Sequence, residues 1–171
     1  MSAKRSVFQA ILIGALALAA TTALAQSVRV LGDFRDWSAY ATSDSAGKIC
    51  FALSKPSVTE PEPEGYAQAY LYLTHRPSEK IRNEINVIAG YIFGPDSTAV
   101  LQVGGESHEL FTSDDAAWLA DVSEAEDIAG QMRAGTSLVI EGESDRGFKI
   151  RQTFSLSGVT AASRAIEAEC Y

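Results

Sequence analysis

Hydrophobic and polar residues alternate along most of the chain, which is the pattern of β-strands that bury one face. Over Lys48–Ser54, the residues Ile49, Phe51 and Leu53 share one parity of the alternation. Over Phe148–Leu156 the large apolar side chains again recur at every second position, with one glutamine among them. The pattern predicts strands over Val28–Leu31, Trp37–Ala41, Lys48–Ser54, Ala67–Thr74, Ile85–Phe93, Ala99–Val103, His108–Phe111, Leu138–Glu141 and Phe148–Leu156.

Short turns separate two pairs of these strands and favour β-hairpins. Gly104 and Gly105 stand between one pair, and the segment Asp145–Gly147 stands between the last two strands. Glycine in so short a connection supplies the positive φ that tight hairpin turns require. The segment Thr59–Gly65 alternates Glu with Pro, so it has few backbone donors and repels itself. We expect an exposed loop between strands there.

Two segments carry the signals of helices. Ser123 is followed three residues later by Glu126, which is the spacing of a capping box, and the expected helix runs to about Ala134. Gly135 is a suitable stop for that helix. The second helix is expected over Thr160–Glu169, close to the end of the chain.

A short helical segment is also expected around Trp118, with Asp114 or Asp115 as its cap. The two adjacent carboxylates could instead hold Ca²⁺, but the spacing of a calcium-binding loop is absent. The elements together predict a mainly β fold, an antiparallel β-sandwich or flattened barrel of about eight or nine short strands. Two short helices, one of them C-terminal, would plug one end of it or cover one edge.

Length and composition narrow the class of protein. A chain of 171 residues favours one domain. With 46% hydrophobic and 21% charged residues the chain is an ordinary globular sequence, which excludes a disordered acidic tail or a coiled coil. The net charge of −8 argues against a nucleic-acid partner, because such proteins present Lys and Arg to phosphates.

Residues 1–25 have the pattern of a Sec-type signal peptide. Lys4 and Arg5 give the positive start, Val7–Ala20 is almost wholly apolar, and Ala23–Ala25 matches an A-x-A cleavage site. The apolar run of about 14 residues is shorter than the roughly 20 that span a bilayer, so cleavage is favoured over a membrane anchor.

We therefore predict cleavage between Ala25 and Gln26 and a protein located in the periplasm or secreted. The mature chain, residues 26–171, would be one β domain. No later stretch is long and apolar enough for a transmembrane segment.

The two cysteines, Cys50 and Cys170, both lie after the predicted cleavage site. In an oxidising compartment two cysteines usually pair, so we predict a disulfide that joins the chain's end to an early strand. A redox pair or a metal site is the alternative. A redox pair favours C-x-x-C spacing and a metal site needs further Cys or His nearby, and the sequence has neither.

Candidate catalytic residues are few. The two histidines, His75 and His108, fall at or near strand ends, and neither belongs to an H-E-x-x-H zinc motif. The chain also lacks the G-x-S-x-G turn of a serine hydrolase. We predict a protein that is not an enzyme and has no cofactor or metal. A periplasmic hydrolase that uses His75 or His108 is the alternative, and a cleft holding a histidine beside a carboxylate would favour it.

A surface for a partner is the remaining candidate. Arg76 and Arg82 belong to a small basic group, with acidic residues interleaved. Tyr70 and Tyr72 stand on one face of a predicted strand, and exposed aromatic side chains are enriched at protein interfaces. These four residues form the predicted partner surface. The alternatives are a solvated loop for the arginines and a half-buried sheet face for the tyrosines.

An ordered set of short segments resembles the invasion-associated locus B family of alphaproteobacterial exported proteins. The resemblance covers most of the mature chain, and the order of the segments carries it. They are Asp36-Trp37, Gly47-Lys48-Ile49-Cys50, Ser54-Lys55-Pro56, Arg76-Pro77, Arg82-Asn83-Glu84, Gly90-Tyr91, Asp115-Ala116-Ala117-Trp118, Ser155-Leu156-Ser157-Gly158 and Cys170.

The resemblance implies a small periplasmic or envelope protein, and it supplies no catalytic residues. We therefore expect an exported, non-enzymatic binding or accessory module with an envelope or host protein as its partner. A factor in host interaction or invasion is the alternative within the same family. The acidic balance of the chain does not suit adhesion to anionic host surfaces.

Overall fold

The structure is a computed structural model, and it describes residues 27–171. Within these residues eleven strands form one antiparallel sheet, and two helices accompany it. The strands are β1 (Arg29–Phe34), β2 (Trp37–Ser43), β3 (Lys48–Ser54), β4 (Pro56–Glu60), β5 (Tyr70–Arg76), β6 (Ile81–Ile88), β7 (Thr98–Val103), β8 (Glu106–Ser113), β9 (Ala116–Leu119), β10 (Ser137–Glu143) and β11 (Lys149–Ser155). The helices are α1 (Ala125–Ala134) and α2 (Val159–Cys170), and short 3₁₀ turns are η1 (Pro77–Glu79) and η2 (Val122–Glu124).

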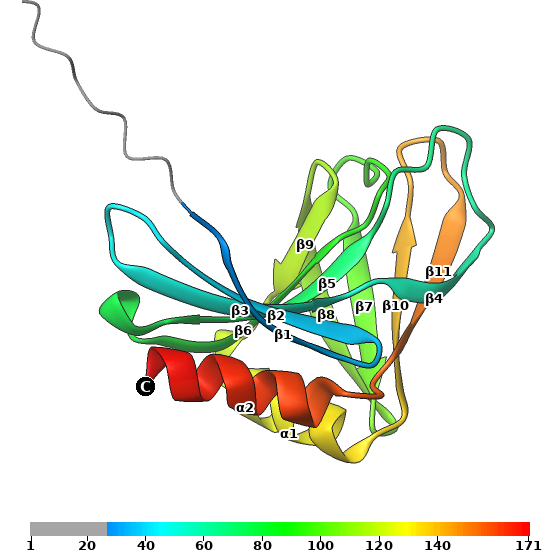
Figure 1. Cartoon of the computed structure of the whole chain (residues 1–171). Helices are drawn as coiled ribbons and strands as arrows, with labels where there is room; N and C mark the ends of the chain where they lie inside the picture. The colour runs from blue at the N-terminus through cyan, green and yellow to red at the C-terminus, as the bar shows by residue number, and fades with distance from the viewer. Residues whose placement is uncertain (1–26) are drawn as a thin grey trace, which may run out of the picture.

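The strand order in the sheet is β1-β2-β3-β5-β6-β9-β8-β7-β10-β11-β4, and the two outermost strands do not pair with each other. Only Lys55 separates β3 from β4, yet β3 lies between β2 and β5 while β4 pairs with β11 at the far edge. In Figure 1 the chain runs on from β3 into β4 and so passes from one part of the curved sheet to the other. The mainly β prediction is confirmed.

The core lies between the inner face of the sheet and the helices. In Figure 1 both helices lie beneath the part of the sheet formed by β1, β2 and β3. Alternate residues of most inner strands point into this core, as the sequence pattern predicted, whereas the edge strands β1 and β4 have no buried residue. The largest fully buried side chains are Trp37, Phe154, Leu71, Leu73, Ile85, Leu101, Leu110, Ile128, Met132, Leu138, Ile140 and Ile150.

Both predicted hairpins are confirmed: β7 pairs with β8 and β10 with β11. Two strands were not predicted. Pro56 begins β4, and an edge strand tolerates proline at its first residue. This strand takes in the start of the predicted Thr59–Gly65 loop. The prediction of a helical segment around Trp118 is wrong, because Ala116–Leu119 forms the strand β9.

The cause of the second error is pairing between distant segments. Alanine-rich β9 has little strand propensity of its own, but it pairs with β6 on one side and β8 on the other. The predicted capping box is also wrong in detail. Asp121 accepts hydrogen bonds from the backbone N–H and the hydroxyl of Ser123 at 2.9 and 2.7 Å, so η2 precedes α1, which begins at Ala125.

The C-terminal helix is joined to the sheet by the predicted disulfide. Cys50 Sγ and Cys170 Sγ are bonded, and their Cα atoms are 6.0 Å apart, within the range that a disulfide spans. Gly158 is the N-cap residue of α2, and its φ of 101° favours glycine. A Cβ there would lie 1.7 Å from the carbonyl oxygen of Phe34, so only glycine fits between the helix and β1.

Candidate functional site

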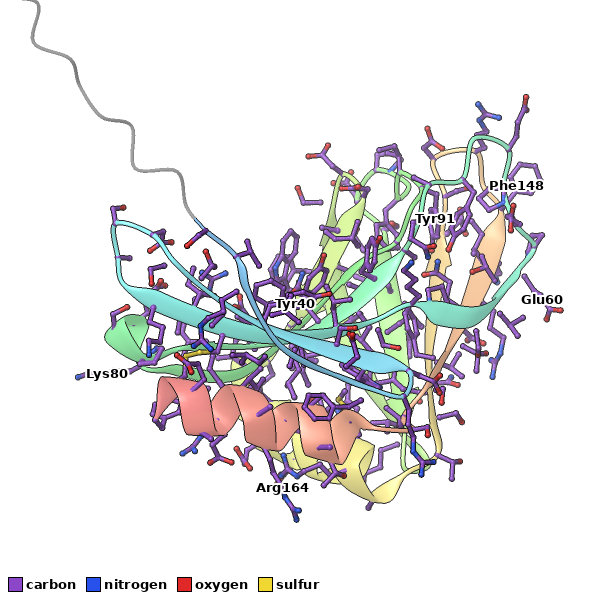
Figure 2. The ribbon with its side chains drawn as sticks, viewed as in Figure 1. Tyr40, Glu60, Lys80, Tyr91, Phe148 and Arg164 are labelled. Carbon is purple, nitrogen blue, oxygen red and sulfur yellow. A yellow bond between two sulfur atoms is a disulfide. The ribbon has the colours of Figure 1, made fainter. Side chains whose placement is uncertain are left out.

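Aromatic side chains gather on the face of the sheet that the helices leave uncovered. In β2 the buried residues Ala39 and Ala41 flank Tyr40, whose side chain therefore points away from α2. Figure 2 shows Tyr40 on the side of the sheet opposite that helix. Tyr40 pairs across strands with Phe51, and their ring centroids are 5.3 Å apart with an interplanar angle of 22°.

The same face continues across β5. The ring of Tyr72 lies 6.1 Å from that of Phe51 and 6.2 Å from that of Tyr70. Burial, and next the neighbouring Tyr70, raises the pKa of the Tyr72 phenol, so this hydroxyl keeps its proton. The amine of Lys55 lies 5.9 Å from the centre of the Tyr70 ring.

A second group of rings lies further along this face. Asn86 of β6 stands opposite Tyr72 on one side and opposite Trp118 of β9 on the other. Trp118 stacks on Phe111 of β8 at 5.4 Å and 19°, and Phe111 is 50% exposed. We call these six rings the aromatic face: Tyr40, Phe51, Tyr70, Tyr72, Phe111 and Trp118.

The orientation of the rings limits what the aromatic face can bind. In the two stacked pairs, Tyr40–Phe51 and Phe111–Trp118, each ring has one face covered by its partner. The two contacts of Tyr72 are tilted, with interplanar angles of 49° and 52°. Ring edges carry partial positive charge and tyrosine hydroxyls donate hydrogen bonds, which suits the carbonyl-rich surface of another protein.

A hollow of about 450 Å³ adjoins the aromatic face where β9 ends. Its lining is mostly apolar, and Val122 of η2, at its border, is 81% exposed. Phe111 and Trp118 belong to both the hollow and the aromatic face. The complete lining is Glu84, Ile85, Phe111, Ser113, Trp118, Leu119 and Val122.

The four residues of the predicted partner surface do not all meet. Tyr70 and Tyr72 lie together on the aromatic face. Arg76 lies further along the same strand, where its Nε donates to Glu84 at 3.0 Å. Arg82 lies elsewhere, against the C-terminal helix.

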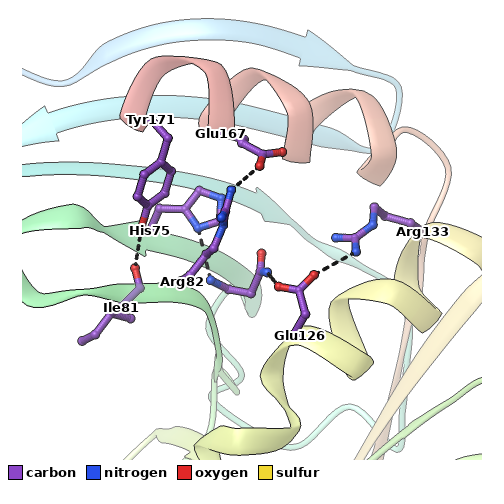
Figure 3. Close-up of polar contacts among 8 residues, drawn as sticks. His75, Ile81, Arg82, Glu126, Arg133, Glu167 and Tyr171 are labelled. Carbon is purple, nitrogen blue, oxygen red and sulfur yellow. Dashed lines mark hydrogen bonds and ion pairs between the residues drawn. The ribbon is translucent and has the colours of Figure 1, made fainter.

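Arg82 forms part of a cluster at the end of α2, shown in Figure 3. Its guanidinium group bonds with Glu167 and lies 4.6 Å from the ring centre of Tyr171. The Tyr171 hydroxyl donates to the carbonyl oxygen of Ile81 at 3.2 Å, and its ring contacts His75 edge-on at 5.6 Å. These contacts attach the chain's last turn to β5 and β6.

His75 is buried in this cluster, with 1% of its surface exposed. Its Nδ1 accepts from the backbone N–H of Asn83 at 3.1 Å, so the neutral ring carries its proton on Nε2. Burial, and next the charge of Arg82, lowers the pKa of His75. The Asn83 side chain continues the network to α1 by donating to Glu126 at 2.5 Å.

His108 has different surroundings. Its Nδ1 lies 2.7 Å from Glu124 of η2, and its buried Nε2 has no hydrogen-bond partner, with the nearest Glu106 oxygen at 3.9 Å. His75 and His108 share no contact. Each has a carboxylate close by, but neither histidine lines the apolar hollow described above.

Two further findings concern residues 27–171 only. In this part of the chain no group of three or more His, Cys, Asp or Glu side chains is arranged to hold a metal ion. None of the described helices has the length and apolar character needed to cross a bilayer.

Four rings of the aromatic face were not identified from the sequence: Tyr40, Phe51, Phe111 and Trp118. A signal for Tyr40 was available, because its strand alternates this large residue with alanines. The two alanines face α2 at close range, so the tyrosine between them lies on the opposite side of the sheet. For Trp118 no such pattern exists, because the short alanine-rich segment around it predicts a helix and not a strand.

Comparisons of the chain with protein-family models, curated proteins and solved structures find no match. The resemblance to the invasion-associated locus B family therefore stays a prediction.

Proposed function

We propose that this protein is an exported, non-enzymatic binding or accessory module of the cell envelope, which holds a protein partner on the aromatic face. The six partly exposed rings carry the proposal. Exposure of large aromatic side chains to water is unfavourable, and monomeric proteins rarely leave extensive apolar patches uncovered. Tyrosine and tryptophan are also enriched where proteins meet and dominate binding energy there.

The proposal includes the resemblance to the invasion-associated locus B family, which is consistent with an envelope or host protein as partner. It also includes export, supported by the pattern of residues 1–25. N-terminal sequencing of protein from the envelope fraction should begin at Gln26. A start at Met1 or Ser2 would contradict export.

Site-specific cross-linking tests the partner surface. A photoreactive phenylalanine analogue at position 72 would place the probe in the middle of the aromatic face, and the same analogue at exposed Arg164 on α2 is the matched control. After irradiation of intact cells we expect a discrete cross-linked species for position 72 and none for position 164. Equal labelling at both positions, or none at either, would overturn the proposal.

A further inference from the structure

The hollow beside the aromatic face is large enough to receive an apolar side chain. Phe111, Trp118, Leu119 and Ile85 provide apolar walls, and Val122 extends the border. Val122 is the most exposed large hydrophobic residue in the described part of the chain. The fold leaves both Val122 and Phe111 exposed, and an apolar group in the hollow would cover the two side chains together.

The border of the hollow is held in place before any partner arrives. Asp121 caps the η2 turn through Ser123 at 2.9 and 2.7 Å. At the other end of the turn, Glu124 bonds with the ring of buried His108 at 2.7 Å. A border fixed from both ends does not lose conformational freedom on binding, which favours tight contact.

Charges around the hollow select the partner. Glu84 lines it, Glu109 lies two residues before Phe111 on the same face of β8, and Asp121 adjoins Val122. Arg76 supplies one opposing positive charge, since it forms an ion pair with Glu84. The excess is negative, as is the whole chain at −8, so a second copy of this chain would be repelled and a basic partner attracted.

We infer that the hollow receives an apolar side chain of the protein partner, presented from a segment that carries Lys or Arg beside it. This inference rests on the proposed function and specifies the partner's chemistry at one point of the aromatic face. The apolar side chain would bury Phe111, Trp118 and Val122, while the flanking cations would face the carboxylates.

Peptide titration tests this inference on the purified protein. The probe is a capped five-residue peptide of alternating lysine and leucine, and the signal is tryptophan fluorescence. Trp37 is 1% exposed and far from solvent, so Trp118 reports the binding. Two control peptides replace either both leucines by serine or all lysines by glutamate.

We expect each peptide substitution to weaken binding at least about tenfold, and Val122→Ser to weaken binding of the original peptide by about fivefold to tenfold. Val58→Ser, at an exposed valine on β4, is the matched control and should bind as the wild type does. Both positions are exposed, so neither substitution should disturb folding, which circular dichroism checks.

Absence of binding by the lysine–leucine peptide would overturn the inference. Equal binding by the glutamate peptide, or by Val122→Ser and the unaltered protein, would overturn it too. If the cross-link at position 72 persists in those cases, the proposed function stands and only the role of the hollow fails. If the probe at position 72 gives no cross-linked species in the otherwise unaltered protein, the proposed function is rejected, whatever the peptides show.

Discussion

The two faces of β2, β3 and β5 are built in opposite ways. Toward α2, β2 and β3 present mostly small residues and the disulfide, with Ala39, Ala52 and Cys50 fully buried, while β5 presents leucines. Away from α2 they present the large rings of Tyr40, Phe51 and Tyr72, each only partly covered. Small residues let a helix approach the sheet closely, while rings on the other side cover the strands without any second layer.

This difference separates stability from recognition. The helix-covered face holds the C-terminus by a covalent bond, close packing and a hydrogen-bonded cluster. The aromatic face has ring contacts within the sheet, and neither α1 nor α2 covers it (Figure 2). Changes on the first face should therefore lower stability, and changes on the second should alter binding with little effect on folding.

The largest effect is expected from Cys170→Ser. The disulfide closes a loop with a sequence separation of 120, and in the chain-entropy model such a bridge contributes about 5 kcal/mol. Thermal unfolding should shift to lower temperature, and hydrogen exchange should show faster exchange in α2 than in β7 or β10. Thiol titration of the non-reduced wild type should find no free cysteine, and detection of two would contradict the bridge.

A pair of neighbouring residues in β5 compares the two faces directly. Leu71 is fully buried, and Leu71→Ala should lower the free energy of unfolding by about 3 kcal/mol through the cavity it leaves. Tyr72→Ala removes a cross-strand ring contact with Phe51 and a contact with Tyr70 of the same strand, and should lower it by about 1 kcal/mol. Urea unfolding measures both values.

Cross-linking from position 111 in the Tyr72→Ala and Leu71→Ala backgrounds then completes the comparison. Partner binding should weaken in the Tyr72→Ala protein. It should persist in the Leu71→Ala protein at temperatures where that variant is folded. The reverse order would show that the aromatic face is structural.

A smaller, pH-dependent effect is expected from His75. Its pKa is lowered in the fold by burial, next by Arg82, while Glu167 and Glu126 act in the opposite direction. The unfolded chain therefore binds more protons, and the free energy of unfolding should fall as pH drops below about 6.5 toward the lower folded pKa. Above that pH the full stability is present.

Chemical unfolding between pH 7.5 and 5.5 measures this loss. The variant His75→Gln should show a flatter pH dependence than the wild type over that range. His108→Gln is the matched control for the second histidine. An unchanged slope in the His75→Gln protein would show that His75 is not the titrating group.

The smallest effect is expected from Arg82→Gln. The guanidinium group pairs with Glu167 at a half-exposed site and lies over the Tyr171 ring, and such contacts contribute about 0.5–1 kcal/mol. Partner cross-linking from position 72 should be unchanged, since Arg82 lies against α2. A marked loss of cross-linking would restore Arg82 to the partner surface that the sequence predicted.

Local signals were sufficient for much of the fold. Gly104 and Gly105, together with period-two alternation on both sides, predicted the β7–β8 hairpin, because turn and strand are neighbours in the chain. They failed at Ala116–Leu119, where two flanking strands rather than the residues themselves produce the extended backbone. Local signals also did not show that Arg82 lies against α2, because residue spacing does not show which side of the sheet a helix covers.

The sequence by itself determined that this chain is rich in strands, ends in a helix and has two cysteines suited to pairing. Each of these follows from residues close together in the chain or from simple counting. Only the tertiary structure decided the strand order, the face that α2 covers and the meeting of Tyr72 with Trp118 through Asn86. Alternation shows that a strand has an apolar and a polar face. Which distant segment packs against each face depends on how the whole chain buries its apolar surface.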